Sequence, residues 1–308
     1  MKKTVGFVGL GDIGAGICSW TLQKGVYDVV AHDIETGKLA AMAQLGARPV
    51  STAAELAGSC DLIALCLPGP HEVRKVCLAP GGIQESVRAR TAIFDLSVVD
   101  PDTSKELAAH FGKRGVLYVD TPHVGTIFDA PRGSLPLIAG ATEKELEEYL
   151  PFLKGLSSTI HFIGSRGSGS AVKLVNSVMS VGNILVAAEA FILGAKAGVD
   201  PGTLFNVIQY FGGSSQRLIT RFPRVLQGDF TPQFTIGLAE KQLTLALDAA
   251  RNLSVPMPMA AACHDFYQRT SSSGRADEDV TAVVQYLEER VGVQLRGRAQ
   301  VASIKWGA

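Results

Sequence analysis

The sequence has no excess of charge of either sign. Its 308 residues include 29 basic and 29 acidic side chains, and charged residues make up only 19% of the chain. Without a bulk field, a protein attracts neither phosphate backbones nor anionic lipids. We therefore expect no nucleic-acid partner and no membrane partner. The charged fraction lies below the ~25% of typical domains, which suggests that another subunit covers part of the surface.

Cysteine is scarce, and the thiols are scattered along the chain. There is no C-x-x-C pair and no cluster of histidines, so no zinc site or other metal site is expected. An odd number of separate cysteines favours reduced, buried thiols in a reducing compartment, which predicts a cytoplasmic protein. The five thiols are Cys18, Cys60, Cys66, Cys77 and Cys263.

No clear targeting or membrane-spanning segment is present. The start, Met-Lys-Lys followed by apolar residues, is interrupted as a signal peptide by Asp12 and by several glycines. Residues 174–195 form an apolar stretch of the length that a membrane-spanning helix needs, but Asn176, Asn183 and Glu189 interrupt it. We expect a long buried helix there instead.

The chain is long enough for two domains at roughly 100–200 residues each, and 46% of it is hydrophobic, which rules out disorder. In residues 1–164, short runs rich in Val, Ile and Phe alternate with helix-length segments, which predicts an α/β, doubly wound, mostly parallel sheet. Residues 165–308 have long Ala- and Leu-rich stretches, which predict an all-α domain that starts with a long interdomain helix. The strands are expected at 4–8, 29–32, 62–67, 92–96, 117–119 and 135–138, and the helices at 13–23, 104–111, 170–197, 203–210, 236–252, 258–269 and 279–290.

A glycine-rich motif follows the first predicted strand and opens a helix. In it, Gly9 allows a tight turn, Gly11 lets a pyrophosphate approach the backbone, and Gly14 lets helix and strand pack closely. The helix N-terminus then points its free N–H groups and its positive dipole end at the phosphates. This pattern predicts a Rossmann domain that binds a dinucleotide through the loop Gly9-Leu10-Gly11-Asp12-Ile13-Gly14.

An acidic residue stands where the second strand ends. Asp33 lies 19 residues after Gly14, where a carboxylate accepts hydrogen bonds from the adenosine ribose. The same carboxylate repels a 2′-phosphate, so NAD is favoured and NADP remains an alternative. The simpler interpretation is a surface carboxylate that starts a turn with Glu35. The ends of the third and fourth predicted strands face the same crevice, so we also expect cofactor contacts from Leu67, Pro68 and Ser97.

The long helix carries a polar stripe. Positions three and four apart share a helix face, so Lys173, Asn176 and Ser177 lie together with Ser180 on an otherwise apolar segment. Burying a lysine without a role is costly. In a closed cleft beside a dinucleotide, such a lysine serves as proton donor or acceptor. The alternative is that Lys173 reaches solvent and Asn176 bonds a neighbouring loop.

Four motifs, in this order, carry a family resemblance. The first is the glycine loop. The second is Asp120-Thr121-Pro122-His123-Val124-Gly125-Thr126, with Ala130, Gly133 and Leu135 beyond it. The third is Gly167-x-Gly169-x-x-x-Lys173 with Asn176, and the fourth runs from Gly228-Asp229-Phe230-x-Pro232-x-Phe234 through Lys241 to Leu245-Ala246-Leu247. Over nearly the whole chain, the sequence resembles the β-hydroxyacid dehydrogenase family, which includes 3-hydroxyisobutyrate dehydrogenase, tartronate semialdehyde reductase and 6-phosphogluconate dehydrogenase.

The resemblance implies a function. The protein is expected to transfer a hydride between a nicotinamide cofactor and a small anionic 3-hydroxy acid or its semialdehyde. Lys173 is implied as general acid/base, Asn176 as a substrate-positioning residue, and Lys241 as a neighbour of the nicotinamide. The implied substrate contacts are Lys173, Ser177 and the loop His123, Val124, Gly125 and Thr126, whose N–H groups hold a carboxylate. The family commonly forms dimers or tetramers through the helical domain.

The chain departs from the family pattern at the substrate end. Val124 replaces the usual Ser, His123 replaces Val, and Thr126 replaces the second Gly; on the two helices, the departures are Ser177 for Asn and Gln242 for Asp. These changes leave the substrate open. They also motivate two alternatives, an imine reductase-like enzyme, against which Lys173 argues, and a non-catalytic dinucleotide-binding sensor. His123 either supplies a positive or hydrogen-bonding contact or has no role.

Two arginines follow a Gly-Gly-Ser-Ser turn in the second half. Arg217 and Arg221 are one helical turn apart. They are candidates for binding an anionic group, although for at least one of them a solvated helix face is the simpler interpretation.

Overall fold

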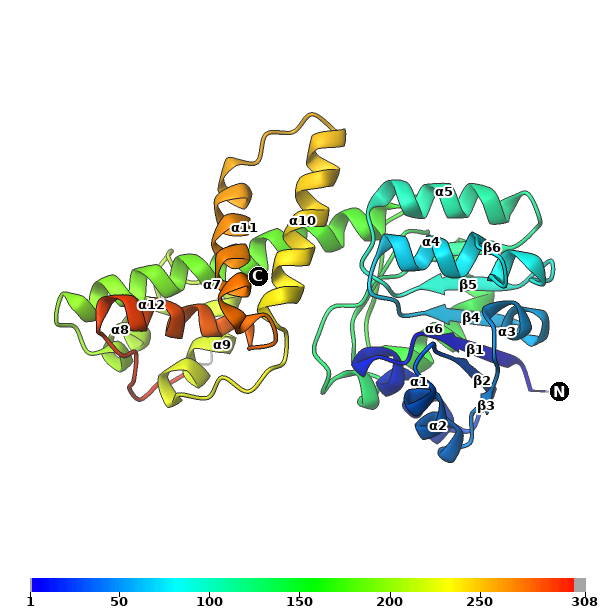
Figure 1. Ribbon diagram of the computed structural model, residues 1–308, viewed down its shortest axis with the longest axis horizontal. Helices are drawn as coiled ribbons and strands as arrows, with labels where there is room; N and C mark the ends of the chain where they lie inside the picture. Colours follow the sequence, from blue (N-terminus) through cyan, green and yellow to red (C-terminus); the bar gives the residue numbers. More distant parts are fainter. Residues whose placement is uncertain (1, 302–308) are drawn as a thin grey trace. The chain divides into compact units, whose positions relative to one another are not determined.

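A computed structural model describes residues 2–301 of the chain, and it divides into two compact units (Figure 1). We call the part up to Leu174 the sheet unit and the part from Val175 onward the helical unit. The predicted boundary lay after residue 164, ten residues earlier. The reason for the difference is that the first two turns of the long helix are bonded into the sheet unit, as described below.

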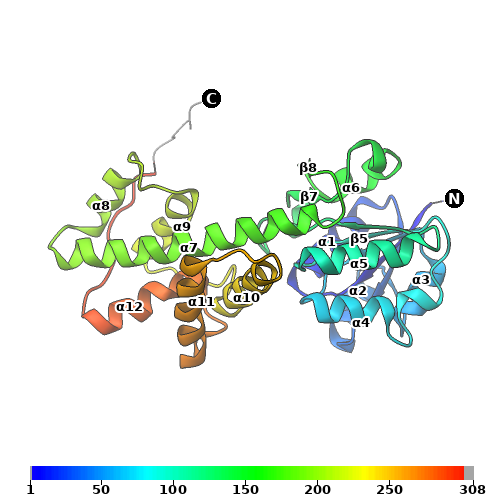
Figure 2. The same cartoon turned by 90° about the horizontal axis from the view of Figure 1, so that it is seen from above.

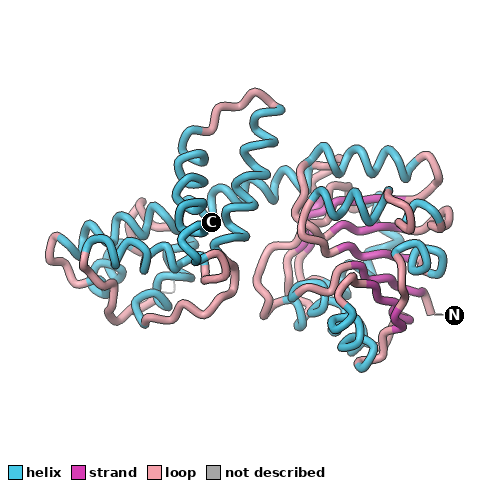
Figure 3. The backbone as a smooth tube through the Cα atoms, in the orientation of Figure 1, coloured by secondary structure: helices cyan, strands magenta, loops and turns pink. Residues whose placement is uncertain are grey.

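The sheet unit contains a six-stranded parallel sheet with the order β3-β2-β1-β4-β5-β6, labelled in Figure 1 and drawn in magenta in Figure 3. This order confirms the predicted doubly wound α/β fold, because it reverses between β1 and β4. Because all strands are parallel, their carboxyl ends lie at one edge of the sheet, and the reversal opens a crevice there between β1 and β4, where ligands bind in such folds. The strands are β1 Thr4–Val8, β2 Asp28–His32, β3 Arg48–Pro49, β4 Leu62–Leu65, β5 Ala92–Asp95 and β6 Leu117–Asp120.

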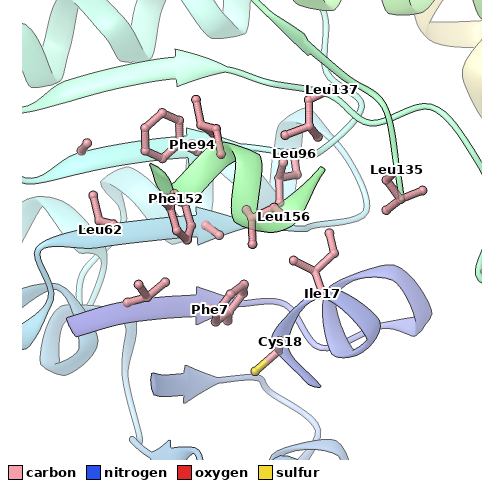
Figure 4. Packing of buried hydrophobic residues seen from close by; sticks show 14 of the residues in the cluster. Phe7, Ile17, Cys18, Leu62, Phe94, Leu96, Leu135, Leu137, Phe152 and Leu156 are labelled. Carbon is pink, nitrogen blue, oxygen red and sulfur yellow. The ribbon is translucent and has the colours of Figure 1, made fainter. Parts of the chain in front are cut away.

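Helices cover both faces of this sheet and give it two hydrophobic cores. Successive strand residues point to opposite faces, so Ile93 and Phe94 of β5 belong to different clusters. In the cluster that Figure 4 shows, the rings of Phe94 and Phe152 lie 5.6 Å apart. The helices are α1 Asp12–Lys24, α2 Thr36–Gln44, α3 Ala53–Ser59, α4 Pro70–Leu78, α5 Pro101–Gly112 and α6 Leu150–Leu156, with short 3₁₀ turns at Ile83–Glu85, Ala130–Arg132 and Lys144–Tyr149.

The last predicted strand does not join the main sheet. Residues 135–138 were expected to belong to it, but β7 (Leu137–Ala139) pairs with β8 (Ile160–Phe162) in a separate two-stranded parallel sheet. An apolar run of this length indicates a strand but not its partner. Neither β8 nor the two-residue β3 was predicted, because segments this short carry no clear periodicity.

The helical unit is all-α, as predicted. Its long helix α7 (Ser168–Lys196) is continuous from the sheet unit onward (Figure 2). One helix was not predicted, α9, because it contains Pro223 and several polar residues. The others are α8 Pro201–Ile208, α9 Gln216–Gln227, α10 Ile236–Asn252, α11 Pro258–Thr270 and α12 Val283–Val291, with a π-helical turn at Ser271–Arg275 and a 3₁₀ turn at Val280–Ala282.

The prediction that α7 is buried is correct for one face only. Ile184 and Phe191 lie in the core of the helical unit. On the opposite face Met179, Val186 and Leu193 are 62%, 57% and 72% exposed. Within residues 2–301, α7 is the one helix that is long and apolar enough to cross a membrane, judged by length and composition alone. Only 33% of its most apolar 18-residue stretch is buried in the structure. The exposed face needs a different explanation, given below.

A buried carboxylate fixes where α7 begins. At the end of β6, the two oxygens of Asp120 accept hydrogen bonds from the N–H groups of Gly167 and Ser170, each at 2.8 Å. A Cβ atom on Gly169 would meet the Ile138 carbonyl oxygen at 2.5 Å, so only glycine fits there. These contacts bind the first turns of α7 to the sheet unit and thereby determine the position of Lys173.

Candidate active site

The glycine loop between β1 and α1 has the geometry that its sequence predicts. Gly9 has a φ of 91°, and a Cβ atom there would lie 2.2 Å from the Cys66 carbonyl oxygen. A Cβ atom on Gly14 would lie 2.0 Å from the Gly9 carbonyl oxygen. At Gly11, in contrast, a Cβ atom would meet nothing within 4 Å. The loop is therefore closed against the protein at Gly9 and Gly14 and open at Gly11, where a ligand approaches.

The N-terminus of α1 supplies hydrogen-bond donors beside this opening. Its N-cap is Gly11, and no side chain caps the helix. The first-turn N–H groups, those of Asp12 and Ile13 included, have no intrahelical acceptor, and the positive dipole end lies among them. Such a helix end suits a pyrophosphate. The residues of the glycine loop thus fit a dinucleotide.

Asp33 lies next to the glycine loop. Its Oδ2 accepts a hydrogen bond from the Leu10 N–H at 2.6 Å, and its Oδ1 accepts one from the Glu35 N–H at 2.8 Å. Both interpretations of this residue therefore have a structural basis, because it starts a turn with Glu35 and also places its carboxylate at the cofactor loop. Its contact with a ribose stays a prediction.

The ends of β4 and β5 meet at the same edge of the sheet. The Leu67 N–H donates to the Ser97 hydroxyl at 2.9 Å, and the Ser97 N–H donates to Asp95 at 3.0 Å. Leu67 also lies beside Gly9, and Pro68 follows it on the exposed side. The structure thus brings these predicted cofactor residues to the glycine loop. Ser97 itself is buried, and its hydroxyl holds the Leu67 backbone.

Lys173 and His123 occupy the same part of the sheet unit. Lys173 is only 7% exposed, although it is a lysine. The Nδ1 atom of His123 lies 3.1 Å from the Leu96 carbonyl oxygen. Burial and the nearby Lys173 charge lower the pKa of His123 from 6.5 to about 4, against the opposing effect of the Leu96 carbonyl. His123 is therefore neutral at pH 7, which removes the positive contact considered for it; the hydrogen-bonding contact and the absence of any role both stay open.

The tautomer of His123 follows from its partner. A carbonyl oxygen only accepts hydrogen bonds, so Nδ1 carries the proton. Nε2 is then left with a lone pair and acts as an acceptor toward a hydroxyl or ammonium donor.

In the loop from His123 to Thr126, some of the hydrogen-bond donors already have acceptors within the protein. The Val124 N–H donates to the Pro136 carbonyl at 2.9 Å. The N–H and hydroxyl of Thr126 both donate to Asp129 Oδ2, each at 2.7 Å. Gly125, with a φ of 131°, lies between them. Among the hydrogen bonds described for residues 2–301, none uses the N–H groups of His123 and Gly125, so these two loop donors remain for a ligand.

In the helical unit, Ser177 and Gln242 form a pair. The Ser177 hydroxyl donates to Gln242 Oε1 at 2.6 Å, and Ser177 is buried. Asn176 precedes this pair on α7, and Lys241 precedes it on α10. Sequence reasoning noted both substitutions but missed that they contact each other. The predicted places of Asn176 at the substrate and of Lys241 at the nicotinamide stay predictions.

The cysteines have the character of core thiols. All five are free. Burial raises the pKa of Cys18 and of Cys66 to about 12, so these thiols are protonated at pH 7 and are poor nucleophiles. Residues 2–301 contain no group of three or more His, Cys, Asp or Glu side chains placed to hold a metal ion.

Comparison with known proteins decides the family. Residues 4–164 match the family model of the NAD binding domain of 6-phosphogluconate dehydrogenase, and residues 167–287 match that of the NAD-binding domain of NADP-dependent 3-hydroxyisobutyrate dehydrogenase. The chain is 33% identical to 2-(hydroxymethyl)glutarate dehydrogenase of Eubacterium barkeri, covering 96% of this chain and 99% of that one. The chain belongs to the β-hydroxyacid dehydrogenase family.

Two further relatives agree with this assignment. The chain is 30% identical to 3-sulfolactaldehyde reductase of Escherichia coli, covering 94% of this chain and 97% of that one. The structure matches 3-hydroxyisobutyrate dehydrogenase of Mycobacterium tuberculosis, solved with L-serine, at a TM-score of 0.86 and 27% identity, covering 93% and 99% of the two chains. As a β-hydroxyacid dehydrogenase, the protein is an NAD(P)-dependent oxidoreductase, which confirms the predicted class of enzyme and cofactor.

Some of the residues that depart from the family pattern are hydrogen-bonded to other side chains of this protein. Ser177 is bonded to Gln242, the other substituted position on the facing helix. Thr126, in place of a glycine, is bonded to Asp129. The substitutions therefore have hydrogen-bond partners within their own units, while the glycine loop and Lys173 keep the family pattern.

The lowered pKa of His123 makes stability depend on pH. Because its folded pKa of about 4 lies below the ordinary 6.5, protonation favours the unfolded chain, and the free energy of unfolding decreases as the pH falls from 6.5 toward 4. His123→Gln should make this decrease smaller, as measured by urea denaturation across that range. The exposed His161→Gln serves as the control and should leave it unchanged. Equal profiles for His123→Gln and wild type would contradict the assigned pKa.

Proposed function

We propose that the protein is an NAD-dependent dehydrogenase or reductase of a small, anionic 3-hydroxy acid or of the corresponding semialdehyde. The observation that carries this proposal is the buried Lys173, at 7% exposure, held in the unit that contains the dinucleotide loop. The relatives named for 2-(hydroxymethyl)glutarate and 3-sulfolactaldehyde support a small anionic substrate.

In this proposal, Lys173 moves the proton and the loop after Asp120 orients the substrate. When the alcohol is oxidised, the Lys173 amine takes the hydroxyl proton, and when the carbonyl is reduced, the ammonium returns it. Bound nicotinamide supplies or accepts the hydride. The Gly125 N–H donates to the substrate carboxylate, and His123 Nε2 accepts a hydrogen bond from a substrate hydroxyl. Because His123 is neutral, it leaves the substrate's negative charge to the N–H and lysine groups.

We infer a preference for NAD over NADP. The Asp33 carboxylate beside Leu10 accepts hydrogen bonds from ribose hydroxyls and repels a 2′-phosphate. No arginine directly follows Asp33 to neutralise such a phosphate.

Replacing the proposed acid/base tests the enzyme assignment. Lys173→Ala should lower kcat by about 10²–10⁴, the usual contribution of general acid/base catalysis. The affinity for NADH should change little, because Lys173 lies outside the glycine loop. Initial rates with a panel of 3-hydroxy acids and semialdehydes give kcat, and NADH fluorescence gives the affinity. The exposed Lys144→Ala is the matched control.

The same panel separates the rival functions. Turnover of imines but not of hydroxy acids would favour the imine reductase-like alternative. Tight NADH binding with no turnover of any substrate would favour the non-catalytic sensor.

A charge-removing variant tests the cofactor preference. Asp33→Asn keeps an acceptor for the Leu10 N–H but removes the negative charge. It should reduce the ratio of kcat/KM with NAD to kcat/KM with NADP by about tenfold or more, the scale of one charge-assisted hydrogen bond. Asp28→Asn, an exposed change on β2, the strand that ends just before Asp33, is the control. An unchanged ratio would remove Asp33 from the ribose site.

We propose that the protein is a homodimer or homotetramer in the cytoplasm. Val172, Met179, Val186 and Leu193 are seven residues apart and all exposed, so α7 presents an apolar stripe of the kind that packs against another helix. A second copy of the chain covers this stripe, which accounts for the low charged fraction. The five free thiols support a reducing compartment.

A charge in the stripe tests the assembly. Val186→Asp should convert the oligomer to a monomer, because it places a carboxylate in an apolar interface. Multi-angle light scattering at micromolar concentration measures the mass, and Val26→Asp in the sheet unit, similarly exposed, is the control. A monomeric wild type would contradict the proposal.

A further inference from the structure

His123 is held in one orientation within the sheet unit. Its backbone forms an antiparallel bridge with Leu137, and the next residue is fixed to the same segment, because the Val124 N–H donates to the Pro136 carbonyl at 2.9 Å. The imidazole ring is fixed through Nδ1, which lies 3.1 Å from the Leu96 carbonyl oxygen. The other ring nitrogen, Nε2, therefore has a defined place beside the loop.

The Nε2 atom of His123 is an accessible acceptor. Among the hydrogen bonds described for residues 2–301, the one that His123 makes with its ring uses Nδ1. The buried side-chain polar atoms without a partner in the same residues are Thr121 Oγ1 and Ser214 Oγ, and Nε2 is not among them, so it reaches the surface of the sheet unit. With the proton on Nδ1, this accessible nitrogen accepts a hydrogen bond and cannot donate one.

Donors for an anion lie beside this acceptor. The N–H groups of His123 and Gly125 are used by none of the hydrogen bonds described for residues 2–301. These N–H groups and the imidazole ring belong to the same three-residue stretch of chain. If a ligand carboxylate accepts from the N–H groups, the carbon next to that carboxylate lies close to Nε2. The substituent on this carbon then decides whether Nε2 has a partner.

The chemistry of Nε2 selects one kind of substituent. A methyl group offers no hydrogen-bond donor and leaves the acceptor without a partner, which is unfavourable once water is displaced. An ammonium group donates but adds positive charge, and burial and the Lys173 charge already oppose positive charge here, since they lower the pKa of His123 to about 4. A hydroxyl group donates without adding charge. It is therefore the substituent that fits.

We propose that His123 makes the protein select 2,3-dihydroxy acids, or the matching 2-hydroxy-3-semialdehydes, through a hydrogen bond from the 2-hydroxyl to Nε2. This inference rests on the proposed function, in which Lys173 exchanges the proton of the 3-hydroxyl. The 2-hydroxyl is a recognition group and is not itself oxidised. The family pattern has an apolar valine at this position, so the selection belongs to the residue that this chain carries there.

The first experiment compares two substrates that differ only in the 2-hydroxyl. Initial rates with each enantiomer of glycerate and with 3-hydroxypropanoate give the ratio of their kcat/KM values. Wild type should prefer one enantiomer of glycerate, and His123→Val should lower the glycerate to 3-hydroxypropanoate ratio about tenfold, the scale of one hydrogen bond. Valine is chosen because the family pattern has it here. The exposed His161→Val is the matched control and should leave the ratio unchanged.

The second experiment measures recognition without turnover. Lactate carries the carboxylate and the 2-hydroxyl but has no 3-hydroxyl, and propanoate carries the carboxylate alone. Thermal unfolding of the full chain with NADH is followed with each acid at the same concentration. Lactate should stabilise wild type and His161→Val more than propanoate does. In His123→Val the two acids should give equal shifts.

The two experiments separate this inference from the proposed function. Equal ratios in wild type and His123→Val overturn the role of His123, and so does a wild type that prefers 3-hydroxypropanoate. Equal stabilisation of wild type by lactate and propanoate overturns the contact with the 2-hydroxyl. If wild type oxidises neither acid but lactate still stabilises it through His123, the proposed function fails for these acids, while recognition of the 2-hydroxyl is supported.

Discussion

The hydrogen bonds of the buried Asp120 carboxylate determine how this protein positions its chemistry. The two oxygens accept from Gly167 and Ser170, each at 2.8 Å, and the Asp120 carbonyl accepts from the Gly140 N–H at 2.8 Å. A Cβ atom on Gly140 would lie 2.2 Å from the carboxylate, so these segments approach as closely as backbone allows. One side chain thus joins the end of β6, a turn and the start of α7. Because Lys173 follows within the next turn, its location depends on this joint.

The glycine loop and the positions that depart from the family pattern follow different constraints. The glycine loop is limited by backbone contacts at Gly9 and Gly14 that no other residue tolerates, so it keeps the family pattern. At the departures from the family pattern, Thr126 is bonded to Asp129 in the sheet unit, and Ser177 is bonded to Gln242 in the helical unit. A buried polar group needs a hydrogen-bond partner, and each of these side chains has one.

Electrostatics in this chain is local. The net charge is +0, and most exposed ion pairs, such as Arg251 with Asp248, contribute little to stability. Positive potential instead collects at particular places, such as the N-terminus of α1, where the uncapped N–H groups of the first turn lie. A protein that is neutral overall still attracts small anions through such places, because burial strengthens each interaction. The cofactor pyrophosphate matches this feature.

The sequence by itself determined the fold class, the dinucleotide loop and the candidate lysine, because periodicity and glycine spacing are local properties of the chain. The strands β1, β2, β4, β5 and β6 and the all-α second half follow from this pattern. The short β3 and β8, the separate pairing of β7 and the helix α9 do not. For the strands the partners lie far away in the chain, and for α9 the interior Pro223 argues against a helix. Only the tertiary structure decided that His123 is neutral, that Ser177 contacts Gln242 and that α7 buries a single face. Each of these depends on which distant groups surround a side chain, and burial and hydrogen bonding, unlike periodicity, exist only once the chain has folded.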